Sequence, residues 1–181
     1  AENWPESNGK AALSLNTRTE ISSAGSNVRD STIRPSGLVY CSDLTPLREN
    51  QTPLLTLPLP AQRDKSVSGG LLTVGVQSFE KGLGVHSRSA LTFATAGKWD
   101  VFLATIGLDA ESHDKGDCVF HVLADGKSIF ERRINRQNLT AVEIKLPITG
   151  CRELTLLVEP GANLDLADHA NWCDARLIKN K

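Results

Sequence analysis

Lys81-Gly-Leu-Gly-Val-His86-Ser-Arg-Ser-Ala-Leu-Thr-Phe93 is the stretch that decides the fold, and Asp165-Leu-Ala-Asp-His169-Ala-Asn-Trp172-Cys-Asp-Ala-Arg176-Leu has a similar character near the end of the chain. Between them, these segments place histidine, arginine, aspartate and tryptophan beside runs of residues that favour strands. Loops at the ends of rigid strands are where binding residues concentrate. The two segments therefore predict a small polar recognition site on a β scaffold, without an obvious reaction motif.

From Leu71 onward, strand-like runs alternate with turn residues at a spacing of about ten residues. Asp125-Gly126 predicts a tight hairpin turn between strands at 117–123 and 128–134, because both residues tolerate a positive φ. Apolar and charged residues alternate over 142–146, which indicates a strand with one buried and one solvated face. No stretch carries a helical period over ten or more residues. We expect an all-β fold, an antiparallel two-sheet β-sandwich of the jelly-roll type.

The first part of the chain has a different composition from the rest. Residues 1–37 are rich in Ser, Asn, Thr and Arg, which predicts an N-terminal extension, an edge hairpin or a linker. Residues 45–70 contain Pro46, Pro53, Pro58 and Pro60, so this region is predicted to be an extended surface loop without a central strand or long helix. One β-sandwich domain is therefore expected at 38–181.

Composition excludes several classes of partner. The chain has 181 residues with 20 basic and 21 acidic side chains interspersed, so no charged patch favours nucleic acid. No apolar run approaches the roughly 20 residues that span a bilayer, so no membrane partner is expected either. The sequence has no methionine, which suggests a processed or excised piece of a longer chain, and a cleaved export signal fits. We expect a secreted, cell-envelope or periplasmic protein.

The four cysteines are sparse for a disulfide scaffold. They stand at 41, 118, 151 and 173, which allows three full pairings. Cys118 and Cys173 lie inside strand-like runs, where a free thiol behaves as a small buried apolar group. We favour reduced, buried thiols over disulfides.

The two opening segments belong to a longer ordered series of motifs that resembles the NPCBM family of carbohydrate-binding modules. That family is related to carbohydrate-binding module family 51, and the resemblance covers residues 38–179. The match runs in order through Val39-Tyr-Cys-Ser-Asp-Leu44, Lys81-Gly-Leu-Gly-Val-His86-Ser, Phe102-Leu-Ala-Thr-Ile-Gly-Leu-Asp109, Val119-Phe-His-Val-Leu-Ala-Asp-Gly-Lys127, Glu153-Leu-Thr-Leu and Asp168-His-Ala-Asn-Trp172.

The resemblance implies a galactose-binding-like β-sandwich. It further implies binding of a galactose-containing glycan, usually in a bacterial protein that also carries a glycoside hydrolase or other domain. Characterised members of the family hold calcium, so a structural calcium ion is expected by resemblance. Family membership does not by itself guarantee a working sugar site.

A sugar site needs hydrogen-bonding groups placed for neighbouring hydroxyls and often an aromatic ring against the pyranose. Six side chains near the quoted motifs are the candidates for ligand binding: His86, Arg88, Asp109, Asp168, His169 and Trp172. For each of them, a purely structural role without ligand contact remains an open alternative. His86 in a tight turn serves equally well to lock the loop by a backbone hydrogen bond, and Trp172 serves equally well as a core anchor.

Acidic residues near two loops suggest where oxygen ligands would gather. The first group is Asp109, Glu111, Asp114 and Asp117, and the second is Asp165 with Asp168. Oxygen-rich loops suit a hard cation such as calcium, but the spacing is not that of an EF-hand. A solvated acidic loop explains the first group equally well, and the sequence assigns no calcium ligands.

The sequence bears on three classes of function. Catalysis is disfavoured, because the sequence has no nucleophile elbow, zinc-protease helix or phosphate-binding loop. The function we favour is a non-catalytic carbohydrate-binding module that recognises galactose-type glycans through a shallow cleft at one end of the sandwich. The alternative is a structural or protein–protein interaction sandwich without a working sugar site.

Overall fold

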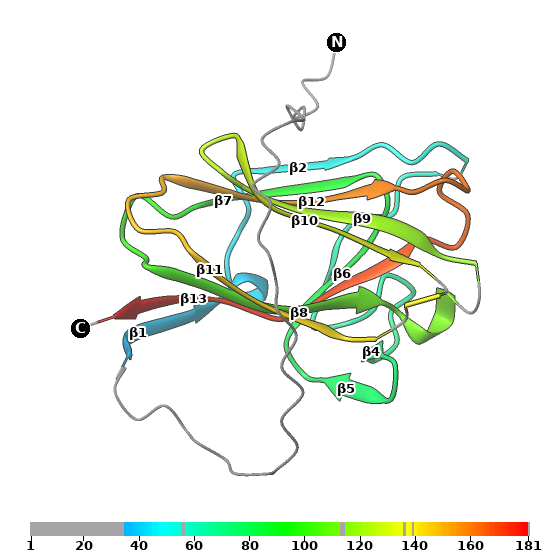
Figure 1. Ribbon diagram of the computed structural model, residues 1–181, viewed down its shortest axis with the longest axis horizontal. Helices are drawn as coiled ribbons and strands as arrows, with labels where there is room; N and C mark the ends of the chain where they lie inside the picture. Colours follow the sequence, from blue (N-terminus) through cyan, green and yellow to red (C-terminus); the bar gives the residue numbers. More distant parts are fainter. Residues whose placement is uncertain (1–34, 56, 113–114, 136, 139, 181) are drawn as a thin grey trace, which may run out of the picture.

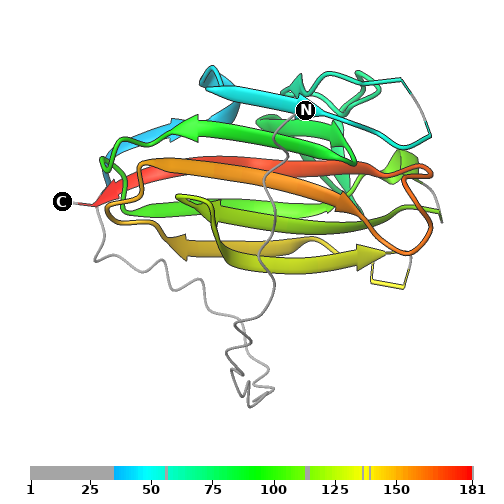
Figure 2. The same ribbon diagram turned by 90° about the horizontal axis from the view of Figure 1, so that it is seen from above.

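The structure is a computed structural model that describes residues 35–55, 57–112, 115–135, 137–138 and 140–180. The extension expected at 1–37 lies outside the described residues except for its last three, which begin the first strand. Two antiparallel sheets are stacked face to face (Figure 1), and the strands of both run along the long axis of the molecule (Figure 2). The predicted antiparallel β-sandwich is confirmed.

The six-stranded sheet has the order β11-β8-β13-β6-β3, with β1 also paired to β13. Its strands are β1 (Pro35–Tyr40), β3 (Gln62–Arg63), β6 (Gly82–His86), β8 (Val101–Leu108), β11 (Val142–Pro147) and β13 (His169–Asn180). The last strand, β13, uses two neighbours on one side: its first half pairs with β6 and its second half with β1. The pairing of β13 with β8 shifts register between Cys173 and Arg176, where Asp174 has a φ of 50°.

The five-stranded sheet has the order β10-β9-β12-β7-β2. Its strands are β2 (Arg48–Gln51), β7 (Ser89–Ala94), β9 (Asp117–Ala124), β10 (Lys127–Asn135) and β12 (Glu153–Pro160). A two-stranded hairpin of β4 (Leu72–Val74) and β5 (Gln77–Phe79) lies below the six-stranded sheet in Figure 1. Two short 3-10 helices, η1 (Cys41–Asp43) and η2 (Ala110–Ser112), complete the described elements, and neither is long enough to cross a membrane.

The turns follow the residue types that the sequence offers. Asp125 and Gly126 both have a positive φ, of 49° and 79°, and connect β9 to β10 as the hairpin prediction required. In the described part of the proline-rich region 45–70, the strands are the short β2 and β3, each at the edge of a sheet. Proline lacks the N–H that a central strand must donate, which explains why the region stays at the edges.

The core fills the space between the sheets. Trp172 of β13 and Phe120 of β9 pack edge to face, with ring centroids 5.2 Å apart, and both rings are fully buried. Leu91, Phe93, Leu154 and Leu156 belong to the same cluster. All four cysteines are buried and free, as favoured from the sequence, and burial raises the pKa of Cys41 to about 12.

Two glycines allow the outer face of the six-stranded sheet to be covered. Gly84 of β6 and Gly107 of β8 lie on either side of Asn171 of β13 in the pairing register. A Cβ at Gly84 would collide with the backbone of Lys65, and a Cβ at Gly107 would collide with Val74 of β4. The missing side chains make room for these segments, and the Asn171 amide donates to the Thr73 carbonyl oxygen at 3.2 Å.

The close approach at Gly84 gives a stability prediction. Gly84→Ala places a methyl group within 2.6 Å of the backbone of Ser66 and Val67, so the covering loop must move. We expect the free energy of unfolding to fall by about 1–3 kcal/mol, measured by urea denaturation. Gly37→Ala is the matched control, because its nearest neighbour is 3.7 Å away, and its effect should be near zero. Equal stabilities of the two variants would contradict this account.

Candidate functional site

One end of the sandwich is organised around a buried carboxylate. Asp168, immediately before β13, has no exposed surface. Its Oδ2 accepts a hydrogen bond from the Ser87 hydroxyl at 2.6 Å, and its Oδ1 accepts one from the backbone N–H of Asp117 at 2.8 Å. Ser87 joins β6 of one sheet to β7 of the other, and Asp117 begins β9. Asp168 therefore ties the two sheets together at this end.

The ionisation of Asp168 reflects this burial. Desolvation raises the pKa of Asp168 to about 6, against the opposing effect of the Asp117 N–H and the Ser87 hydroxyl, which favour the charged form. With its oxygens turned inward to these donors, the side chain has a structural function in this geometry. The prediction that Asp168 contacts a sugar directly is not supported by its position, since the group is sealed from solvent.

His86 and His169 meet on the outer side of the six-stranded sheet. They are directly opposite each other in the pairing of β6 with β13, and their ring centroids lie 5.7 Å apart. His86 is 4% exposed, and its Nδ1 lies 2.5 Å from the Ser87 carbonyl oxygen, which matches the loop-locking alternative. His169 is half-buried, with Nδ1 at 3.4 Å from the Ser68 hydroxyl.

Asp109 is also enclosed by protein donors. It is 2% exposed, and its carboxylate accepts hydrogen bonds from the backbone N–H groups of Thr73 and Glu111 and from the Asn171 amide, at 3.2, 2.9 and 2.5 Å. These bonds connect β4 and η2 to β13. Asp109 is thus placed to hold the covering hairpin, and no part of its carboxylate is directed to solvent.

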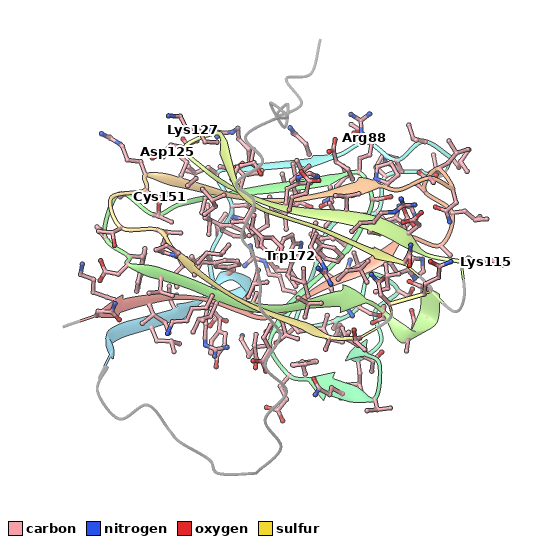
Figure 3. The ribbon with its side chains drawn as sticks, in the orientation of Figure 1. Arg88, Lys115, Asp125, Lys127, Cys151 and Trp172 are labelled. Atoms are coloured by element: carbon pink, nitrogen blue, oxygen red, sulfur yellow. The ribbon has the colours of Figure 1, made fainter. Side chains whose placement is uncertain are left out.

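Trp172 corrects the expectation of an aromatic sugar platform. Its indole has 0% exposed surface and packs in the core against Phe120 (Figure 3). The physical reason is the two-residue period of a strand, because positions an odd number apart point to opposite faces. His169 and Trp172 are three residues apart on β13, so one faces outward and the other faces the core. The core-anchor alternative describes Trp172.

The six predicted residues therefore do not converge on one hollow. Asp109, His86 and His169 lie on the covered side of the six-stranded sheet. Arg88 differs, because it follows Ser87 into the five-stranded sheet and points outward on that side of the sandwich (Figure 3). It lines one of the two solvent-accessible hollows described next.

The first hollow, which we call the end hollow, has a volume of about 550 Å³. Its lining residues are Lys115, Gly116, Asp117, Arg133, Asn135, Gln137, Asn163 and Leu166. The Arg133 guanidinium donates to both oxygens of Asp117, from Nε at 2.8 Å and from Nη2 at 2.5 Å. This pairing holds the pKa of Asp117 below its usual range, so the carboxylate stays charged. Asn163 adds a buried Oδ1 that has no hydrogen-bond partner among the described residues.

The second hollow, which we call the side hollow, has a volume of about 490 Å³. Its lining residues are Leu54, Arg88, Val119, His121, Glu131, Glu159 and Pro160. It lies on the outer side of the five-stranded sheet. Of the residues that line the two hollows, Arg88 was predicted as a ligand contact and Asp117 as a possible cation ligand, whereas the other polar residues were not predicted.

Two of the carboxylates predicted as possible calcium ligands are held by protein donors. The carboxylates of Asp109 and Asp117 are filled by N–H donors and by Arg133, and Asp114 lies outside the described residues. Among the residues that the structure describes, no group of three or more His, Cys, Asp and Glu side chains is placed to hold a metal ion. The calcium ion implied by the resemblance remains a prediction without an assigned ligand set.

Comparisons with known proteins agree with the fold. The model of the NPCBM/NEW2 domain matches residues 37–178. A protein of Renibacterium salmoninarum, whose name describes an endo-alpha-N-acetylgalactosaminidase, is 32% identical over 111 residues. That match covers 61% of this chain but only 7% of the relative, so the chain corresponds to a small part of it.

Solved structures give the same result. The family 51 carbohydrate-binding module from Clostridium perfringens GH95, in complex with methyl-galactose, has a TM-score of 0.70 and 25% identity, covering 78% of this chain and 99% of that one. The Clostridium perfringens ZmpB structure with an M60 catalytic domain and two such modules has a TM-score of 0.73 and 28% identity, covering 81% of this chain and 16% of that one. A ZmpB module in complex with GlcNAc has a TM-score of 0.73, with coverage of 81% and 32%, and its 23% identity shows the fold alone.

The raised pKa of Asp168 predicts a pH-dependent effect on stability. Its folded pKa of about 6 lies above the unfolded value near 3.9, so the folded state binds this proton more tightly. The stability contributed by protonation is fully present below about pH 4 and is lost as the pH rises through 6. The wild type should therefore lose free energy of unfolding relative to Asp168→Asn between pH 4 and pH 7, measured by urea denaturation.

Asp174→Asn is the control for this experiment, because Asp174 is an exposed carboxylate on the same strand. Its difference from wild type should change little over the same pH range. If wild type instead kept or gained free energy of unfolding relative to Asp168→Asn as the pH rose, Asp168 would be charged in the folded protein well below pH 6.

Proposed function

Because the chain belongs to the NPCBM/NEW2 family, we propose that it is a non-catalytic carbohydrate-binding module whose end hollow holds a galactose-type sugar. The observation that carries the proposal is the polar lining of this hollow around the Asp117–Arg133 pair. The methyl-galactose complex of the Clostridium perfringens GH95 module supports the choice of sugar.

The lining suits hydroxyl groups in both hydrogen-bonding directions. The Arg133 guanidinium, whose side chain is 49% exposed, can donate to a hydroxyl while it stays paired with Asp117, and bonds of this charge-assisted kind are the stronger ones. Asn135, Gln137 and Asn163 each carry a side-chain amide that both donates and accepts. Because the pair is held in a bidentate geometry, these groups are positioned before a ligand arrives.

Asp168 has a supporting function in this proposal. Its Oδ1 fixes the backbone N–H of Asp117, and the Asp117 Oδ2 in turn accepts the N–H of Ala162 at 2.9 Å. This chain of bonds holds the start of β9 against the loop that carries Asn163. The family motif around Asp168 therefore shapes the hollow from beneath, without touching the sugar.

A single sugar residue should bind weakly. A few hydrogen bonds and a small apolar contact with Leu166 supply about 4–8 kcal/mol, which corresponds to dissociation constants on the order of millimolar to micromolar. Recognition of this strength is useful when the module is attached to another domain, because attachment raises the effective concentration. We propose that the module belongs to a larger exported protein and keeps a catalytic domain near its glycan, an arrangement supported by the M60 enzyme structure with its two modules.

The sugar proposal is tested by titrating methyl-galactoside with calorimetry or by NMR. Asn163→Ala and Gln137→Ala should each weaken binding by about tenfold, because one lost hydrogen bond to a ligand costs roughly 1–1.5 kcal/mol. Gln77→Ala is the matched control, since this exposed amide lies on the β4–β5 hairpin, away from the end hollow. Its affinity should equal that of wild type.

Two outcomes would overturn the proposal. Unchanged affinity in both end-hollow variants would place the sugar elsewhere on the module. Failure of a folded wild-type protein to bind methyl-galactoside or any glycan on an array would favour the alternative, a structural or protein–protein interaction sandwich.

Absence of catalysis is a separate prediction. Nitrophenyl galactosides and nitrophenyl N-acetylgalactosaminides should release nitrophenol no faster with the protein than in buffer. Two carboxylates, Glu131 and Glu159, lie in the side hollow, and paired carboxylates are the machinery of glycoside hydrolysis. Turnover that disappears in Glu131→Gln or Glu159→Gln would therefore contradict the non-catalytic assignment.

A further inference from the structure

The end hollow and the side hollow are neighbours on one face of the β9–β10 hairpin. Cys118, Phe120 and Val122 of β9 pack in the core, so the alternate residues of that strand point to the outer face. The outward-facing positions pair in the order Asp117 with Asn135, Val119 with Arg133, and His121 with Glu131. The first pair lines the end hollow and the third lines the side hollow.

The middle pair connects the two hollows. Arg133 lines the end hollow, and Val119, directly opposite, lines the side hollow. The first and third pairs are four residues apart along the strand, a separation of about 13 Å. This length is comparable with that of two linked pyranose rings.

His121 indicates that the side hollow binds a polar ligand. The residue is 3% exposed, and it lines the hollow. Its Nε2 lies 3.2 Å from Glu159 and its Nδ1 lies 3.7 Å from Glu131, but neither nitrogen makes a hydrogen bond of acceptable geometry. A buried polar atom without a hydrogen bond is costly, so a ligand hydroxyl that reached one of these nitrogens, once a flanking glutamate side chain had moved aside, would bind favourably.

The rest of the side hollow has the two kinds of surface that a pyranose requires. Glu131 and Glu159 offer acceptors, and Arg88 offers donors in a planar fork. Leu54, Val119 and Pro160 supply an apolar wall in the same hollow for the C–H face of a ring. The end hollow, in contrast, has Leu166 as its one apolar side chain among the described lining residues.

We propose that the side hollow is a second sugar subsite, so that the β9–β10 face binds a disaccharide or a longer segment of glycan across both hollows. This inference rests on the proposed function, because it extends the ligand of the end hollow. The terminal galactose-type ring lies in the end hollow, and the next ring lies against Arg88, His121 and Glu131. The Val119–Arg133 pair separates the two hollows, so the glycosidic linkage that places one ring on each side of this pair should be preferred.

The test compares one sugar ring with two. Wild-type protein is titrated by calorimetry with methyl-galactoside and with galactose-terminated disaccharides in beta-1,3, beta-1,4 and alpha-1,3 linkage. At least one disaccharide should bind about tenfold more tightly than the monosaccharide, because the second ring adds contacts in the side hollow. Glu131→Gln and Arg88→Ala should remove this gain and leave the affinity for methyl-galactoside unchanged.

Controls separate local effects from folding. The Glu131 side chain is 67% exposed, so Glu131→Gln should fold normally, which is checked by thermal denaturation. Arg48→Ala is the matched control for Arg88→Ala, because Arg48 is an exposed arginine of the same sheet that pairs with Glu153 at the other end of β12. It should keep both affinities.

The outcomes distinguish this inference from the proposed function. If methyl-galactoside binds and no disaccharide binds more tightly, or if the gain survives both side-hollow variants, the second subsite is wrong while the end-hollow proposal stands. If neither the monosaccharide nor any disaccharide binds, both proposals fall. A gain that is lost in Glu131→Gln and Arg88→Ala, and kept in Arg48→Ala, supports the second subsite.

Discussion

The Asp168 carboxylate is the interaction on which this end of the molecule depends. It receives the Ser87 hydroxyl from the crossover between the sheets and the Asp117 N–H from the first residue of β9. The carboxylate of Asp117 then holds Arg133 of β10 and the backbone of Ala162. One buried acid thus positions elements of both sheets, and the outward-facing groups of the end hollow take their places from it.

The outer faces of the two sheets differ in whether other segments cover them, and on the six-stranded sheet the covering depends on small side chains. On the six-stranded sheet, Gly84 and Gly107 leave space that is filled by a loop and by β4, and Asn171 and Asp109 fasten that covering by hydrogen bonds. At the same end of the five-stranded sheet, the outward positions carry Asp117, His121 and charged residues of β10, which line the hollows instead of being covered. On this side the polar side chains of β10, such as Glu131 and Arg133, reach solvent, whereas Asp117 and His121 lie buried beneath them.

Much of the fold was predictable, because it depends on local patterns. Asp125-Gly126 fixed the β9–β10 turn, alternation over 142–146 indicated a half-buried strand, and the prolines confined residues 45–70 to sheet edges. Our sequence prediction placed His169 and Trp172 in one site, although the same two-residue period puts residues three positions apart on one strand on opposite faces. Only the structure shows which of the two faces the core.

The hollows were harder to predict because they depend on a bulge. The β9–β10 pairing begins at the turn with Lys127 opposite Ala124 and Ser128 opposite Leu123, but it shifts by one residue before Phe130. In the unshifted register, Arg133 would lie opposite Cys118, whose side chain faces the core. A shift of one residue reverses the facing of a strand, and here it brings Arg133 to the side of Asp117. No residue type between 128 and 130 announces that shift.

These relations separate the residues that identify the family from those that meet the ligand in our proposal. The motifs around His86 and Asp168 are mostly buried, and they hold loops, sheets and the covering hairpin in place. The proposed sugar contacts come from β10, from the outward side of β9 and from the loop that carries Asn163. Substitutions at the exposed positions among these, such as Glu131, would leave the buried frame intact, so related sandwiches with the same motifs can differ in the glycan that they bind. Recognition of the fold and choice of ligand are therefore governed by different parts of this chain.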